Sequence, residues 1–175
     1  RFKYDFYYRQ YTELYCKLYA IVIQSEYVRR FMKLQTGKET SFDEAPFLEI
    51  SPTRRITNTL KFENGAASKV STETEEIITP ISQFNKKQLC DYIIENGAYS
   101  SQKLLKIAMS YRFAYNYYSG NPVTKNSECQ KIADDEEFRL IREMICCIVS
   151  EYNYYRKALN MNYDENELNT GIPQL

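Results

Sequence analysis

The most informative absence in this sequence is histidine, which does not occur among its 175 residues. Catalysis by Ser-His-Asp or Cys-His groups, histidine-ligated metals and haem, and pH sensing by histidine are therefore excluded. Tryptophan is also absent, and glycine and proline occur only five times each. So few turn-forming residues argue against a β-sandwich and against a long disordered tail.

Net charge is absent as well, since 23 basic residues balance 23 acidic ones. A neutral chain has no general affinity for nucleic acid, which is therefore not an expected partner, and a membrane surface is not favoured. The sequence has no apolar run near 18 residues and no signal peptide, so we expect an intracellular location, cytoplasmic or nuclear. Because the first residue is arginine, we expect a fragment of a longer chain.

Cysteine is present, but its spacing indicates no particular chemistry. The cysteines are odd in number and widely spread except for one adjacent pair: Cys16, Cys90, Cys129, Cys146 and Cys147. No C-x-x-C motif occurs, so we expect neither a disulfide framework nor structural zinc. Cys146 and Cys147 have no base available in the sequence, and we interpret them as core sulfurs rather than nucleophiles.

Other motifs that carry chemistry are also missing. There is no glycine-rich phosphate loop, Walker motif, kinase motif set or G-x-S-x-G sequence. The successive carboxylates at 134–137 would point in different directions on a helix, so they form a poor metal site. We predict no catalytic, cofactor-binding or metal-binding residue, no cofactor and no small-molecule substrate, and we expect a protein that is not an enzyme.

Tyrosine is the unusual excess, with 17 copies beside nine phenylalanines. One explanation is the coding bias of an AT-rich genome, or a core with tyrosine at its rim. The other is a contact surface, because tyrosine offers a large area with few rotors and a polar tip. Both explanations stay open at the level of sequence.

The best-formed helical pattern lies between residues 138 and 159. Apolar residues recur there at alternating spacings of three and four, as in the a/d seam of a packed helix: Phe138, Ile141, Ile145, Ile148, Tyr152, Tyr155 and Leu159. A second long helix is predicted over residues 3–35, where Thr36-Gly37 supplies the end. Its two neighbouring apolar stripes suggest contact with two other helices.

Two further helices are predicted between these. The shorter one spans residues 85–95, with Asn85 as its N-terminal cap and Asn96-Gly97 as its end. The longer one begins near residue 100 and ends before a break that Asn121-Pro122 enforces. A short connection then makes it the antiparallel neighbour of the last helix.

The segment from about 38 to 83 shows no helical periodicity. It is rich in serine, threonine and glutamate, and it contains several of the prolines. A strand near residues 56–62, followed by a turn at Glu63-Asn64-Gly65, is one interpretation of its middle, and a short helix is another. Loops of this length in compact domains are usually functional or disordered.

These patterns together predict an all-α fold. We expect an up-and-down helical bundle of three long helices plus one shorter helix, with coiled-coil-like packing and a long, partly ordered insertion at about 38–83 after the first helix. The whole chain, 1–175, is expected to form a single helical domain, with the insertion as a long connection that holds a short hairpin or helix.

The insertion also carries three candidate phosphorylation sites. Ser51-Pro52 with Arg54 two residues on resembles a proline-directed kinase site, Arg54-Arg55-Ile56-Thr57 resembles a basic-directed site at Thr57, and Thr79-Pro80 is again proline-directed. A phosphate beside Arg54 and Arg55 would pair with them and order the loop. Such short motifs also recur by chance in Ser/Thr-rich loops.

Candidate partner contacts are of two kinds. Tyr8, Tyr117 and Tyr154 lie off the main apolar seams and are expected to be exposed. Arg29, Arg30 and Lys33 form a basic cluster near the end of the first helix, suited to an acidic partner, although such clusters are usually only solvated.

The leading functional hypothesis is a non-enzymatic, intracellular protein–protein interaction or scaffold module within a larger assembly, regulated by phosphorylation of the long loop. The partner would be another protein, through self-association or as a subunit of a hetero-complex. One alternative is a helical module that binds membrane surfaces through the basic faces of the first and third helices. Another is a viral or host regulator that captures a partner helix in a groove.

Overall fold

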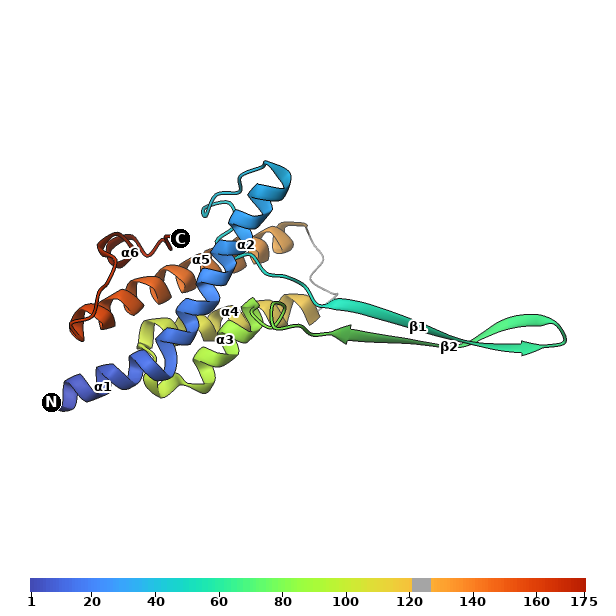
Figure 1. Ribbon diagram of the computed structural model, residues 1–175, viewed down its shortest axis with the longest axis horizontal. Coiled ribbons are helices and arrows are strands. Elements are labelled where there is room, and N and C mark those ends of the chain that lie inside the picture. The colour runs from blue at the N-terminus through green and yellow to red at the C-terminus, as the bar shows by residue number, and fades with distance from the viewer. Residues whose placement is uncertain (121–126) are drawn as a thin grey trace. The chain divides into compact units, whose positions relative to one another are not determined.

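The computed structural model describes the backbone of residues 1–120 and 127–175 and the side chains of residues 1–117 and 128–175. The chain divides into two compact units (Figure 1). The helical unit contains residues 1–49 and 85–175, and the hairpin unit contains residues 50–84. Each unit has its own architecture.

The first part of the helical unit is one continuous helical stretch. It consists of α1 (Phe2–Gln10), a π-helical turn η1 (Tyr11–Tyr15) and α2 (Cys16–Thr36). The middle of this stretch is buried at Tyr11, Leu14, Leu18 and Ile21, whereas Tyr4 and Met32 near its ends are 50% and 42% exposed. The predicted end is confirmed, because Gly37 terminates α2 with φ 70°, a conformation that glycine adopts without steric cost.

The next helices follow their local capping signals. The predicted helix over 85–95 is confirmed as α3 (Lys86–Glu95), and the Asn85 side chain accepts a 2.9 Å hydrogen bond from Gln88 N. A 3-10 turn, η2 (Gly97–Tyr99), leads into α4 (Gln102–Gly120), where the Ser101 hydroxyl accepts from Leu104 N. The break predicted at Asn121-Pro122 lies outside the residues that the structure describes.

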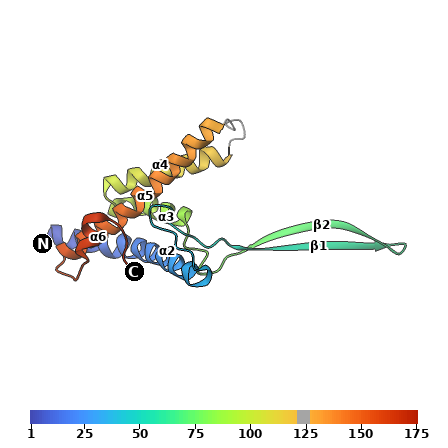
Figure 2. The same cartoon turned by 90° about the horizontal axis from the view of Figure 1, so that it is seen from above.

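The longest helix is α5 (Ser127–Ala158), which packs alongside α4 (Figure 2). It begins well before Phe138, which is itself 41% exposed. The rest of the predicted seam is buried except for the partly covered Tyr152, and Leu140, Met144 and Val149 widen it. The wider buried stripe fits a helix that contacts α4 on one side and α2 on another.

The tail after α5 folds back onto it through α6 (Glu165–Thr170). Glu167 is only 2% exposed, and its carboxylate accepts hydrogen bonds from Tyr19 Oη at 2.7 Å, Asn153 Nδ2 at 3.2 Å and Gln174 N at 2.8 Å. A buried carboxylate is tolerated only when such donors replace its water. Glu167 therefore fastens the tail to both α5 and the first helical stretch.

The core of the helical unit draws on every long helix. Its fully buried side chains are mostly aliphatic: Leu14, Leu18, Ile21, Val22, Leu89, Ile93, Leu104, Met144, Ile145 and Ile148, with Tyr15. Burial on this scale supplies the main hydrophobic stabilisation of the fold.

The hairpin unit contains two antiparallel strands, β1 (Thr53–Glu63) and β2 (Ala66–Ile77). They are joined at Asn64 and Gly65, whose φ angles of 51° and 77° suit the type I′ turn that matches strand twist. The register runs from Thr53 opposite Ile77 to Glu63 opposite Ala66, and it shifts by one residue between Thr59 and Leu60.

The prediction of an all-α bundle of three long helices and one shorter helix is therefore wrong. The structure is 61% helix and 14% strand, and the strands form a two-stranded antiparallel sheet. The all-α prediction missed these strands because polar residues occupy both faces of the ribbon, so apolar and polar positions do not alternate regularly along it. Within the described parts of the chain, no helix is both long and apolar enough to cross a membrane.

Candidate protein-interaction surface

The hairpin exposes apolar side chains that nothing in its own unit covers. Ile56, Leu60 and Phe62 are 64%, 52% and 73% exposed. Because successive side chains of a strand alternate between faces, these residues share one face of β1. We call Ile56, Leu60 and Phe62 the apolar face of β1.

The hairpin is unusual in how fully its side chains are exposed to solvent. Every residue of β1 is exposed, and so is every residue of β2 except Ile77, which is partly covered. An isolated two-stranded hairpin is at best marginally stable in water, because it has no second layer against which to bury a face. A long ribbon with an uncovered apolar face is typical of an element that is completed by another chain.

Charge is distributed unequally between the two strands. β1 carries Arg54 and Arg55 near its start, and β2 carries Glu73, Glu75 and Glu76. Arg54 Nε lies 3.8 Å from Glu76 Oε1, with both side chains well exposed. Such an exposed pair contributes little stability, so the main effect of these charges is on which partner strand or protein can bind the hairpin.

A second exposed apolar stripe runs along α4 in the helical unit. Met109, Phe113 and Tyr117 recur every four residues and are 44%, 67% and 44% exposed. The rings of Phe113 and Tyr117 stack with centroids 5.5 Å apart. The predicted contact residue Tyr117 thus lies in an apolar stripe on the surface.

The other predicted tyrosines lie elsewhere in the helical unit. Tyr8 is 52% exposed on α1, and Tyr154 is 47% exposed on α5. The Tyr154 hydroxyl lies 3.3 Å from that of Tyr7, and their rings meet edge to face. This hydrogen bond lowers the pKa of Tyr7 and raises that of Tyr154. Tyr154 therefore contacts Tyr7 within the chain, and the rest of its side chain is exposed.

The predicted basic cluster separates into one structural arginine and two surface cations. Arg29 forms a pair with Glu26 at 3.1 Å and donates to the carbonyl oxygens of Thr40, Ser41 and Ala45. Its guanidinium therefore holds the loop after α2 against that helix. Arg30 is exposed, and Lys33 Nζ lies 3.3 Å from Glu39 Oε1. Arg29, Arg30 and Lys33 all line a surface cavity of about 610 Å³.

The candidate phosphorylation sites differ in access. Ser51 and Thr57 are exposed, and Thr57 is part of β1. Thr79 is partly covered, and its hydroxyl accepts a 3.2 Å hydrogen bond from Ser82 N while Ser82 Oγ accepts from Thr79 N at 2.9 Å. This reciprocal capping occupies the Thr79 hydroxyl, so a kinase would have to open the turn first.

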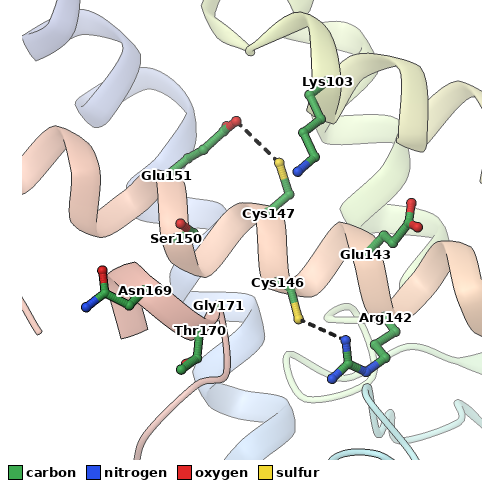
Figure 3. Close-up of a pocket in the computed structure, with 10 residues that line it drawn as sticks. All are labelled: Lys103, Arg142, Glu143, Cys146, Cys147, Ser150, Glu151, Asn169, Thr170 and Gly171. Carbon is green, nitrogen blue, oxygen red and sulfur yellow. Dashed lines mark hydrogen bonds between the residues drawn. The ribbon is translucent and has the colours of Figure 1, made fainter. Parts of the chain in front are cut away.

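The 460 Å³ cavity beside α5 is the strongest candidate for chemistry (Figure 3). Lys103 points toward Cys147, whose Sγ lies 3.3 Å from Glu151 Oε1. Burial, and then the charge of Glu151, raises the pKa of the Cys147 thiol. A thiol that stays protonated is a poor nucleophile, so this arrangement does not support covalent catalysis.

Glu151 has a structural role that the sequence did not indicate. The Tyr15 hydroxyl donates to Glu151 Oε2 and accepts from Ser101 N at 3.1 Å. Burial and the Glu151 charge raise the pKa of Tyr15, which keeps its hydroxyl protonated as a donor. The contact joins η1, α5 and the start of α4. Only the fold brings residues 15, 101 and 151 together, and no sequence spacing could have revealed it.

The carboxylates at 134–137 remain separate in the structure, as the helix geometry requires. Asp134 accepts from Gln130 at 2.9 Å, and Glu136 pairs with Arg139 at 2.6 Å. The Arg139 hydrogen bond lowers the pKa of Glu136. Across the described residues, no group of His, Cys, Asp or Glu is placed to hold a metal ion.

Comparison with known proteins finds no matching family model, no matching curated protein and no matching solved structure.

Proposed function

We propose that this chain is a non-enzymatic protein–protein interaction module that works within a larger intracellular assembly. The single observation that carries the proposal is the apolar face of β1, which is exposed at Ile56, Leu60 and Phe62. Uncovered apolar area of this kind on an extended ribbon favours a protein partner, because a second chain can both cover the face and pair with an edge.

The contrast with the cavity beside α5 supports a binding role over an enzymatic one. The cavity's cysteines, Cys146 and Cys147, both have raised pKa values because of burial. Its other residues include both cations and anions, so it does not favour one sign of ligand charge. Among the residues that the structure describes, no disulfide joins two cysteines, which is the state that a reducing compartment maintains.

Phosphorylation is the proposed means of regulation, and Thr57 is the site best placed for it. Thr57 and Arg55 are two residues apart on β1, so they share the face opposite Ile56. A phosphate on Thr57 would pair with the Arg55 guanidinium and change the charge along the strand without touching the helical core.

The proposal is tested by capture from the native cell with cross-linking mass spectrometry. A variant with Ile56→Thr, Leu60→Thr and Phe62→Thr keeps strand-forming residues but removes the apolar face. We expect it to lose its cross-linked partner, whether a second copy or another protein, because the covered apolar area is gone.

The matched control is Ile132→Thr on α5, which removes an apolar side chain that is also 64% exposed. We expect the control to keep the partner. Equal capture by the triple variant and the original chain, with cross-links that avoid residues 50–84, would exclude the hairpin as the interaction surface.

A further inference from the structure

The two outer edges of the hairpin are not equivalent. The register shift leaves Val70 as an extra residue in β2, so the bulge interrupts that strand. β2 also carries Glu73, Glu75 and Glu76 near its C-terminal end. Bulges and charges are the devices by which proteins protect a strand edge from pairing with another chain.

The edge of β1 has no bulge, and its charged side chains (Arg54, Arg55, Lys61 and Glu63) are of both signs, so a second copy of the strand can match them. β1 runs for 11 residues without proline or an inserted residue, and Ile56, Leu60 and Phe62 project from one of its faces. An open edge next to a protected edge in the same ribbon indicates which strand receives a partner.

The sequence of β1 is complementary to itself about Thr59. If a second copy of β1 lies antiparallel with Thr59 opposite Thr59, then Arg55 lies opposite Glu63 and Ile56 lies opposite Phe62. Opposite charges and aromatic–β-branched pairs are favourable across antiparallel strands. In this register no two charges of the same sign face each other, because Thr57 lies opposite Lys61.

We propose that two copies of this chain pair through the outer edges of β1, antiparallel and centred on Thr59. The inference rests on the proposed interaction function and names its partner. It yields a four-stranded sheet in the order β2, β1, β1, β2, with the Ile56, Leu60 and Phe62 side chains of both copies on one face.

This arrangement also limits the assembly to two copies. Both β1 edges are consumed at the two-fold axis, so the sheet ends on each side with β2. These terminal edges carry the Val70 bulge and the glutamates, which prevent a third copy from pairing. A closed dimer results rather than a growing fibre.

The register is tested by disulfide cross-linking of the full chain on a Cys129→Ser background, which removes an exposed thiol. In the proposed dimer, the Cα atoms of two Thr59→Cys residues face each other at about 4.5–5.5 Å, within the range of a disulfide. Two Thr57→Cys residues would be offset by four positions, about 13 Å, and cannot join. We expect a covalent dimer for Thr59→Cys and none for Thr57→Cys.

The charge complementarity is tested with two charge-reversal variants, each studied alone and then as an equimolar mixture. Arg55→Glu and Glu63→Arg each place like charges across both symmetric contacts, and we expect each to weaken the dimer about tenfold in sedimentation. In an equimolar mixture, every contact between the two variants is attractive again, so we expect heterodimers that form at least as readily as the original dimer.

The outcomes separate this inference from the proposed function. Equal cross-linking at positions 57 and 59, or a mixture that associates no better than either variant alone, overturns the pairing of β1 with itself. If the chain is then monomeric and still captures another protein through the apolar face of β1, the interaction function stands. If the original chain neither associates with itself nor captures another protein through the apolar face of β1, both the pairing of β1 and the interaction function are overturned.

Discussion

The helical unit and the hairpin unit satisfy the same physical requirements in opposite ways. In the helical unit, aliphatic side chains such as Leu14 and Ile148 are fully buried, and the buried Glu167 carboxylate is surrounded by donors. In the hairpin unit, β1 has no buried residue at all. The helical unit is therefore stable through its own packing, whereas the hairpin depends on its turn, its ladder and whatever covers its apolar face.

The largest difference is expected at alkaline pH, where ionisation of buried tyrosines acts directly on the helical unit, whereas the strands contain no tyrosine. Burial raises the pKa of Tyr155 from 10 to about 12, and burial also raises the pKa of Tyr19. The unfolded chain ionises these tyrosines near pH 10 but the folded chain does not, so stability is complete below pH 10 and is lost as the pH rises toward 12.

The measurement is thermal unfolding followed by circular dichroism across that range, with tyrosinate absorbance recorded in parallel. Tyr8, which is 52% exposed, ionises in the folded chain, so only the buried tyrosines should titrate together with the loss of helix. Full tyrosinate absorbance in a chain that keeps its melting temperature would contradict the prediction.

Truncation of one apolar side chain in each unit should give the next largest contrast. Ile145 is 0% exposed and Leu60 is 52% exposed. We expect Ile145→Ala to lower the free energy of unfolding by about 3 kcal/mol, because it leaves a cavity. Leu60→Ala should change it by about 0.5 kcal/mol or less. Urea titration measures both, and similar values for the two would mean that the hairpin is packed as firmly as the core.

Two glycines with the same backbone conformation allow the cost of backbone strain to be separated from the cost of a steric clash. Gly171 has φ 70°, and a Cβ there would lie 2.6 Å from the Cys146 carbonyl oxygen. Gly37 has the same φ, with nothing within 4 Å of its Cβ position. We expect Gly171→Ala to destabilise the helical unit by about 2–3 kcal/mol and Gly37→Ala by about 1 kcal/mol. Equal losses would show that the tail moves away from α5 without cost.

The smallest expected contrast concerns two arginines. Arg29 is mostly buried and donates to the loop carbonyls of Thr40, Ser41 and Ala45, whereas Arg54 is exposed and pairs with the exposed Glu76. We expect Arg29→Lys to cost about 1 kcal/mol, because an ammonium cannot reproduce the planar fork of donors. Arg54→Lys should cost nothing measurable. Chemical denaturation of both variants checks this, and an unchanged Arg29→Lys would show that water replaces the lost donors.

Local signals in the sequence predicted much of the helical unit. Asn85 as the cap of α3 and Gly37 as the end of α2 depend only on neighbouring residues, so they could be recognised without the fold. The candidate surface could be predicted only in part. The strand near Ile56 and the Asn64-Gly65 turn were one interpretation of the long segment, but a ribbon of this length was not expected.

The hydrogen-bond partners of the core were beyond prediction for a different reason. Glu151 and Glu167 look like ordinary surface carboxylates in the sequence, and Arg29 looks like part of a solvated basic patch. Each becomes structural only because the fold places a distant hydroxyl, amide or carbonyl beside it. Helical periodicity reports which face turns inward but not which polar groups meet there.

The sequence by itself determined the absence of histidine chemistry, the positions of most helices and the self-complementary order of residues in β1. These properties depend on composition and on neighbours a few residues apart. The tertiary structure alone decided that the tail folds back through Glu167, that Arg29 is consumed within the chain and that Ile56, Leu60 and Phe62 stay uncovered. The reason is that burial and pairing are properties of segments far apart in the chain, which meet only when it folds.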